Sequence, residues 1–404
     1  MTSAPPVTPP SPTPAPTSDV DLFSDDVLAD PYPAYAALRA LGPAVFLPAQ
    51  GVWALTRHRE IREALTDHET YSSSDGVALN DFNNDSSKGS VLATDPPDHT
   101  ALRRVLSRQL APRAIASLAE SMTAAAEVAV AEIAAKGSFD AVTDLVTPYV
   151  TTMVADLIGL PPEQRDRLGD WANAAFDTFG PPNPRTFASA PVVGELFGYL
   201  MGVATPDRLT PGSWGADIYA AAERGDIPAE AGVSLMLAYT TASMDTTISG
   251  LTRTIDLLAR HPEQWAALRA DPDALIPAAF DEALRLDAPV QVFARRVRRD
   301  VRVGEAELPT GAWVILLYGS AGRDTARWGA DADAFDITRA DTTDHLAFGA
   351  GAHTCAGLGL ARLEAKALLG ALARHAVTLS PAGEPVRRLN NTLRGLAELP
   401  VTVA

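Results

Sequence analysis

The chain has 404 residues and a formal net charge of −17 at neutral pH, because 50 acidic residues outnumber 33 basic ones. This charge disfavours nucleic acid as a partner, and no basic tract offsets it. No apolar run reaches the roughly 18 residues of a membrane helix. The start of the chain also lacks the features of a secretory signal, so we expect a cytoplasmic protein without a membrane partner.

The chain shows one composition break, near its start. Residues 1–17 are rich in proline and cannot build a core, so we expect a disordered tail there. The length would allow two or three domains at about 150 residues each, but no internal linker divides the remainder. We therefore predict a single large domain over 18–404 that acts as a monomer.

The first part of this domain mixes helix and strand. Apolar residues at helical spacing from Tyr32 predict a helix, the runs 44–47 and 52–56 suit strands, and 57–66 returns to helix. A polar stretch at 72–90 follows. Its few apolar residues, Val77, Leu79 and Phe82, suit a loop folded over a ligand, although an ordinary surface loop explains them equally well.

A helix is predicted to start after Asp95, since prolines and an aspartate suit a first turn. In it His99 and Arg103 lie four residues apart on one face, as two groups that bind one anion should. Taken alone, the pair fits an ordinary solvated helix face better.

Helical segments continue over 115–135 and 142–158, and the chain then becomes turn-rich and aromatic around Phe176, Phe179 and 180–184. This segment could form a lid over a pocket or a rigid connector.

A long helix over 230–260 is apolar nearly all round, which places it in the centre of the domain. Its interior nevertheless contains Asp245 and Thr246. A threonine hydroxyl that donates to the Ala242 carbonyl would loosen the helix and open a groove. The alternative is that both polar residues have a purely structural role.

Glu282 and Arg285, three residues apart, read as a helix ion pair. Strands are predicted at 290–296, 301–303 and 313–317, and 390–395 reads as a hairpin tip that contacts substrate.

The only cysteine, Cys355, follows two glycines and precedes an apolar helical run over 358–372. Helix N–H groups stabilise a thiolate, and Gly349, Gly351 and Gly357 leave room for a flat ligand over the loop. A lone cysteine is usually a small buried hydrophobe, and zinc would need more ligands. A cysteine protease using His353 or His345 leaves the glycines unexplained, whereas haem supplies its own nitrogens and needs one sulfur.

The sequence F-G-A-G-A-H-T-C-A-G at 348–357 resembles the haem-binding loop of the cytochrome P450 family. The segment from Ala242 to Thr247 is similar to the family's oxygen-activating motif, with Ser243 in place of the usual glycine. Glu282 and Arg285 resemble its E-x-x-R motif, for which Arg339 stands in the matching later position. We expect these three residues to be structural.

The resemblance implies a mainly α cytochrome P450 fold: one helical domain with a small β-rich lobe, holding haem b. Cys355 would ligate the iron, and Asp245 and Thr246 would act in catalysis by delivering protons to oxygen. The resemblance also implies that four residues hold the propionates: His99, Arg103, Arg295 and His353. The full set of implied cofactor-binding residues is His99, Arg103, Arg295, Phe348, Gly349, His353, Cys355 and Gly357.

The implied activity is O2-dependent hydroxylation or O-demethylation, with electrons from a ferredoxin and a ferredoxin reductase. Three loops, 76–82, 289–291 and 391–395, look similar to members that oxidise para-substituted benzoates. The central helix offers no arginine for a carboxylate, but Lys88 could bind one. The candidate pocket residues are Val77, Leu79, Phe82, Phe176, Phe179, Ala242, Val290, Val292, Phe293 and Leu393.

Two kinds of alternative stay open. The substrate could be a terpenoid or a secondary-metabolite intermediate, and the chain could be a peroxide-using member of the family or a haem protein that senses or carries a gas. A carrier has no use for the proton relay that Asp245 and Thr246 suggest.

Overall fold

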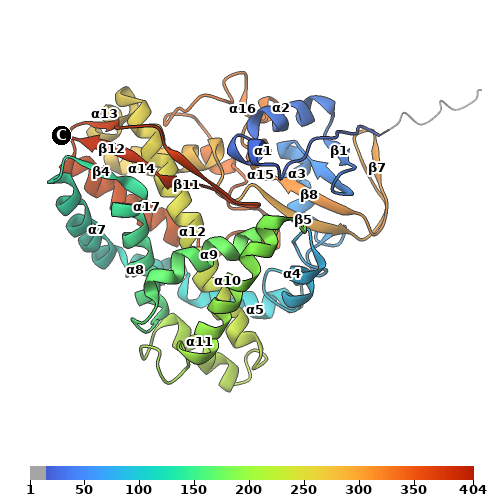
Figure 1. The fold of residues 1–404 in the computed structure, drawn as a ribbon, viewed down its shortest axis with the longest axis horizontal. Coiled ribbons are helices and arrows are strands. Elements are labelled where there is room, and N and C mark those ends of the chain that lie inside the picture. Colours follow the sequence, from blue (N-terminus) through green and yellow to red (C-terminus); the bar gives the residue numbers. More distant parts are fainter. Residues whose placement is uncertain (1–14) are drawn as a thin grey trace, which may run out of the picture.

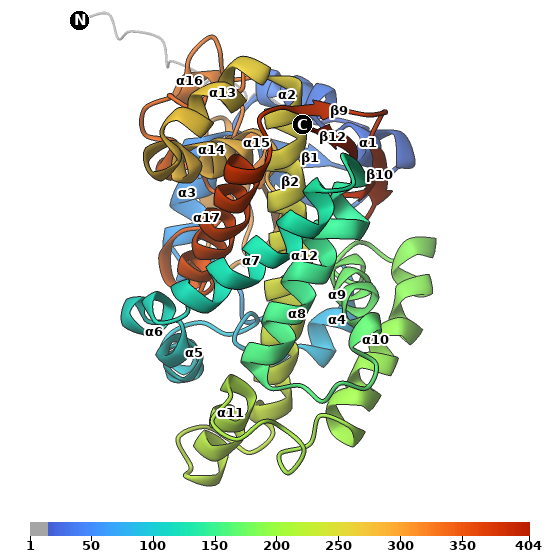
Figure 2. The same ribbon diagram turned by 90° about the vertical axis from the view of Figure 1, so that its left-hand side faces the viewer.

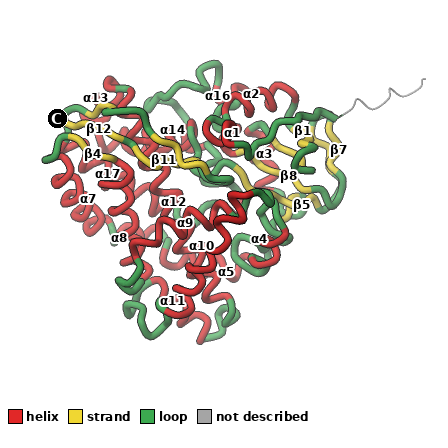
Figure 3. Tube along the Cα trace, in the orientation of Figure 1, coloured by secondary structure: helices red, strands yellow, loops and turns green. Residues whose placement is uncertain are grey.

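The structure is a computed structural model that describes residues 15–404 (Figure 1). It consists of a large helical body and a smaller lobe that contains the main sheet (Figure 3). The helical elements, in chain order, are α1 (Asp25–Ala29), α2 (Tyr32–Leu41), α3 (His58–Thr66), α4 (Asp81–Ser86), α5 (Asp98–Gln109), α6 (Pro112–Ala116), α7 (Ala119–Ala134), η1 (Ala141–Val146), α8 (Thr147–Ile158), η2 (Arg165–Arg167), α9 (Leu168–Asp177), α10 (Pro184–Gly202), α11 (Trp214–Glu223), α12 (Ala231–Arg260), α13 (Pro262–Ala270), α14 (Pro272–Leu286), α15 (Tyr318–Ala321), α16 (Thr325–Trp328), η3 (Thr342–Asp344), η4 (Gly351–His353) and α17 (Leu358–His375).

The main sheet has the strand order β1-β2-β8-β5-β3. Only the β2–β8 pair is parallel. Its strands are β1 (Ala44–Leu47), β2 (Val52–Leu55), β3 (Tyr71–Ser72), β5 (Val292–Val297) and β8 (Trp313–Leu317). Three smaller sheets pair β6 (Val301–Val303) with β7 (Ala306–Leu308), β10 (Val386–Leu389) with β11 (Arg394–Glu398), and β12 (Pro400–Val403) with both β4 (Ser138–Asp140) and β9 (Leu379–Pro381).

Helix α12 runs through the middle of the helical body, and α8, α9 and α14 pack against it (Figure 2). Leu235, Met236, Leu251 and Leu258 on this helix are completely buried. Because its apolar residues point in several directions, the helix can pack against neighbours all round, as the sequence predicted. Its polar interior residues are therefore held at a fixed place inside the domain.

Most predicted elements are confirmed, and three expectations are wrong in detail. The stretch 72–90 contains the helix α4, whose first turn is capped because the Asn80 side chain accepts a hydrogen bond from the Asn83 N–H. The expected helix over 115–135 is two helices, α6 and α7. The expected tail ends before Pro16, since the Phe46 N–H donates to the Pro16 carbonyl at 2.8 Å and Thr17 pairs with Phe46 of β1. The rest of that tail, 1–14, lies outside the described residues.

One helical stretch, 141–158, is long and apolar enough to cross a bilayer by composition. Half of it is buried inside the fold, where Val146, Val150 and Val154 join the helical core.

Candidate functional site

The Cys355 loop is a tight turn followed by α17. The Cys355 N–H donates to the Phe348 carbonyl at 2.8 Å, and Gly349 and Gly351 both have positive φ angles, of 67° and 69°. A Cβ atom at Gly351 would lie 2.4 Å from the Leu65 carbonyl oxygen, so no side chain fits there. A Cβ at Gly349 or Gly357 would meet nothing closer than 3.5 Å. The loop thus has one face packed on α3 and one face free of side chains at these glycines.

The Cys355 side chain is exposed on this loop. Desolvation by the surrounding protein atoms raises the pKa of the thiol. The N–H groups of Gly357 and Leu358 and the Arg103 guanidinium act in the opposite direction, because they favour the thiolate. A metal ion bound by the sulfur would favour the thiolate further, since coordination deprotonates a thiol.

Basic side chains gather beside this loop. The rings of His99 and His353 lie 4.3 Å apart, and among the described residues the Nε2 atom of each is buried without a hydrogen bond. The Nε2 atom of His353 lies 4.0 Å from an Asp95 carboxylate oxygen. Arg103 donates to the Thr354 carbonyl, and Arg295, only 3% exposed, donates to the Ala294 carbonyl at 2.8 Å. Burial and the charges of His353 and Arg103 lower the pKa of His99 to about 4.

This arrangement fits haem. Ring nitrogens without hydrogen bonds, the half-buried Arg103 guanidinium and the buried Arg295 guanidinium suit the carboxylates of two propionates. The glycine face suits a flat ring. In residues 15–404 no three or more His, Cys, Asp or Glu side chains gather as metal ligands. A metal held by Cys355 would therefore need ligands that come with a cofactor, as haem provides.

The polar residues of α12 lie where the helix meets an open face. Ala242 is exposed in the middle of this otherwise buried helix, and Thr246 beside it is half-buried. The Thr246 hydroxyl donates to the Ala242 carbonyl at 2.6 Å, as the sequence predicted. Ser243 donates to the Tyr239 carbonyl, so its hydroxyl is also engaged within the helix.

Asp245 lies next to this face but turns toward another helix. It is 5% exposed, and its Oδ2 accepts a hydrogen bond from the Asn173 side chain of α9 at 2.8 Å. Burial raises the pKa of Asp245, while the Arg388 charge and the Asn173 bond lower it. A buried carboxyl with a raised pKa is a candidate group for holding and releasing a proton.

The candidate pocket wall is brought together from four segments. Phe179 contacts Phe176 and Phe293, with ring centroids 6.0 and 5.5 Å apart. The Leu79 N–H donates to the Phe179 carbonyl, and the Ala294 N–H donates to the Val77 carbonyl, at 2.9 and 2.8 Å. Val290 pairs with Leu393 at the hairpin tip, and Val292 is buried in the adjoining strand. The 176–184 turn therefore acts as a connector docked on its neighbours in this structure.

Two expectations about the 76–90 loop are wrong. Phe82 is 66% exposed and lies on the outer side of α4, because the amphipathic turn of α4 buries Asn84 instead. Lys88 forms an exposed ion pair with Asp85 at 2.6 Å. It is therefore turned to solvent and not to the candidate pocket.

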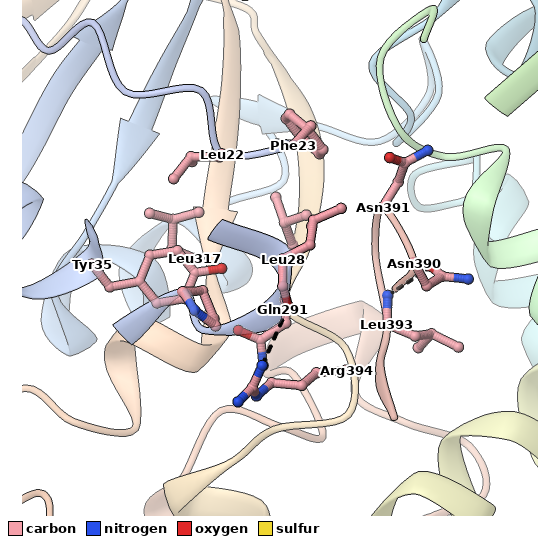
Figure 4. A pocket seen from close by; sticks show the side chains of 12 residues that line it. Leu22, Phe23, Leu28, Tyr35, Gln291, Leu317, Asn390, Asn391, Leu393 and Arg394 are labelled. Carbon is pink, nitrogen blue, oxygen red and sulfur yellow. Dashed lines mark hydrogen bonds between the residues drawn. The ribbon is translucent and has the colours of Figure 1, made fainter. Parts of the chain in front are cut away.

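The sequence did not indicate that the N-terminal segment closes this region. Leu22, Phe23 and Leu28 line a small cavity together with Val292 and Leu393 (Figure 4). Scattered apolar residues before α2 carry no periodic signal, so they could not be assigned. A groove between this segment and the 181–185 turn is bordered by the Arg185–Asp25 ion pair, at 2.7 Å.

A buried polar cluster under the same turn was also not predicted. Asp177 accepts hydrogen bonds from the Asn391 N–H at 2.8 Å and from the Ser189 hydroxyl at 3.3 Å. Burial raises the pKa of Asp177 to about 6. The Asn80 side chain donates to the carbonyls of Thr178 and Gly180, both at 2.7 Å. These bonds hold the 177–183 turn against α4 and the hairpin tip.

Several of the known proteins to which this chain is similar are named cytochrome P450. A family model described as cytochrome P450 matches residues 223–402. The chain is 40% identical to cytochrome P450 CYP199A2 of Rhodopseudomonas palustris, over 99% of both chains. It is 32% identical to the vitamin D(3) 25-hydroxylase of Pseudonocardia autotrophica, over 96% of this chain and 97% of that one.

Among solved structures, cytochrome P450 CREJ in complex with (4-ethylphenyl) dihydrogen phosphate is similar, with a TM-score of 0.85 and 28% identity. The match covers 93% of this chain and 98% of that one. The similarity therefore extends over both the helical body and the β-rich lobe.

Proposed function

We propose a substrate class for this chain, which belongs to the cytochrome P450 family of haem-dependent monooxygenases. In this proposal it hydroxylates or O-demethylates a small aromatic substrate of the para-substituted, benzoate-like type. The observation that carries the substrate class is the chain of contacts between Phe176, Phe179 and Phe293. Aromatic rings in edge or tilted contact form a rigid apolar wall against which an aromatic ligand can pack with its edge or its face. The related protein with a bound para-substituted phenyl phosphate agrees with this class.

The roles of the site residues follow from their positions. The bound haem, with Cys355 as its thiolate ligand, supplies oxygen activation. His99, Arg103, Arg295 and His353 would hold its propionates, since their donors gather on one side of the Cys355 loop. Phe348, Gly349 and Gly357 would shape the surface under the ring.

Asp245 and Thr246 would hold and move protons at the open face of α12. The Asp245 carboxyl is buried against α9, and the Thr246 hydroxyl lies one residue further along the helix, next to that face. An acid and an alcohol at this place favour catalysis over gas sensing or carriage, because binding a gas reversibly requires no proton source.

Electrons would come from a ferredoxin and a ferredoxin reductase, as the similarity to bacterial members of the family implies. A monomeric state and a cytoplasmic location also belong to this proposal. A terpenoid or secondary-metabolite substrate is the second candidate, because Leu22, Leu28 and Leu393 add aliphatic surface to a cavity that polar side chains also line.

The substrate class is tested by titrating the purified holoprotein with matched ligands and following the haem spectrum. We expect saturable spectral changes with para-substituted benzoates and with their neutral para-substituted analogues. Because Lys88 is turned to solvent, Lys88→Ala should leave the benzoate affinity within about twofold, as for a solvent-exposed ion pair. Binding of terpenoids alone would contradict the proposal.

Thr246→Ala should preserve haem content and substrate binding while damaging proton delivery. Positioned proton donors contribute about 10²- to 10⁴-fold, and Asp245 remains, so we expect product per NADH to fall about tenfold. The electrons from NADH that do not form product should reduce oxygen to hydrogen peroxide. The measurement is the ratio of peroxide formed to NADH consumed.

Ser243 complicates this result, because its hydroxyl lies one turn before Thr247 and could support a water near Thr246. More peroxide in the double variant Ser243→Gly with Thr246→Ala than in the single variant would show that Ser243 helps. Full coupling in both variants would mean that the Asp245–Thr246 pair is structural.

A further inference from the structure

The Asp245 carboxylate has a specific partner that the known motifs of the sequence do not indicate. Asn173, half-buried on α9, donates through its Nδ2 to Asp245 Oδ2 at 2.8 Å. The two residues are 72 positions apart in the chain. A donor at this distance fixes the orientation of the carboxylate, because a buried oxygen without its partner costs free energy.

Asn173 is itself fixed from its other side. The Asn390 side chain donates to the Asn173 carbonyl at 2.9 Å, and its Oδ1 accepts the N–H groups of Thr392 and Leu393, both at 2.9 Å. Figure 4 shows Asn390 bonded back to Leu393 at the hairpin tip. Asn390 is 2% exposed, so these bonds form in a site without bulk water.

The three residues connect the pocket to the acid. Leu393 lines the cavity of Figure 4 and pairs with Val290, and Asn390 joins this tip to α9 at Asn173. From Asn173 one further hydrogen bond reaches Asp245 on α12. A displacement of the tip by a ligand would therefore move the residue that orients the acid.

We propose that Asn173 is a positioning residue for proton delivery by Asp245, and that Asn390 holds Asn173 in register with the hairpin tip that bounds the substrate pocket. This inference rests on the proposed function, in which Asp245 supplies protons.

The charged groups around Asp245 determine what the amide contributes. Arg388 of β10 favours the carboxylate, whereas Asp170 of α9 disfavours it. Asp177, also of α9, is coupled to Asp245 by repulsion. The Asn173 hydrogen bond adds to the effect of Arg388, so its removal should shift proton release by Asp245 to higher pH.

The test uses Asn173→Leu, which keeps the side-chain volume but removes the donor, in the full-length holoprotein with saturating substrate. We expect an unchanged haem spectrum and substrate affinity, and product formation slowed about tenfold to a hundredfold, as for the loss of one hydrogen bond to a charged group. The solvent isotope effect should increase, and the alkaline limb of the pH–rate profile, where the acid loses its proton, should move to higher pH. An infrared titration of the Asp245 carboxyl band, identified by its loss in Asp245→Asn, should show the same shift without turnover.

Two comparisons separate positioning from general stability. In the Asp245→Asn background, Asn173→Leu should add no further slowing, because it acts through the acid. Gln264→Leu removes an amide that donates to the Phe335 carbonyl at 2.7 Å, far along the chain on α13, and should leave rate, isotope effect and pH profile unchanged.

Unchanged isotope effect, pH profile and infrared titration in Asn173→Leu would overturn the inference, provided that Asp245→Asn itself slows product formation. If Asp245→Asn has no effect on rate or isotope effect, the proposed proton role of Asp245 fails instead. An additive loss in the double variant would show that Asn173 acts on stability and not through Asp245.

Discussion

Cys355→Ser should abolish product formation and remove the thiolate signature from the spectrum of the reduced carbon monoxide complex. The Cys355 sulfur is the exposed donor of its loop, and the N–H groups of Gly357 and Leu358 and the Arg103 guanidinium favour its charge. A serine hydroxyl stays protonated in the same surroundings and cannot donate comparable electron density to iron. Without that donation O–O cleavage is no longer favoured.

Loss of haem would also remove the signature, so a second variant is needed. Cys355→His keeps a strong iron ligand but replaces the thiolate by a neutral nitrogen. We expect it to retain haem, measured as the haem-to-protein ratio, while lacking both the signature and the activity. An unchanged spectrum and retained activity in either variant would show that Cys355 does not ligate the iron.

The sequence predicted the parts of the site that depend on local chemistry. The glycines around Cys355 and the polar pair in the apolar helix 230–260 differ in type from their neighbours in the chain. Such differences can be recognised from the sequence alone. The helix α12 and the Thr246–Ala242 hydrogen bond both occur as expected. The contacts among Glu282, Arg285 and Arg339 do so too.

The sequence could not indicate residues that act through distant partners. Asparagine is common at caps and turns, so neither Asn173 nor Asn390 differs from a surface residue before the chain folds. Their contacts join segments 72 and 217 residues apart. The prediction that Phe82 contacts the ligand is wrong for a local reason. An apolar residue in a polar stretch suggested a ligand contact, but the short helix α4 directs its side chain outward.

The largest loss of stability is expected from Arg285→Met. Arg285 is completely buried and donates to both carboxylate oxygens of Glu282, at 2.6 and 2.8 Å, and to the carbonyls of Gly322, Ala332 and Ala334. The variant leaves Glu282 buried beside Arg339 alone. Breaking a buried pair by removing one partner costs about 3–5 kcal/mol. We expect a lower urea midpoint for unfolding and faster haem loss.

Two further variants distinguish the charge from the hydrogen bonds. Arg302→Met removes an arginine whose pair with Glu305 is exposed, so the urea midpoint should hardly change. In the double variant Glu282→Leu with Arg285→Met no carboxylate is left uncompensated, and part of the stability should return. The three carbonyls would still lack donors, because a methionine has none, so recovery should be incomplete. A double variant as unstable as Arg285→Met would assign the whole effect to these carbonyls, which anchor the 322–334 segment to α14.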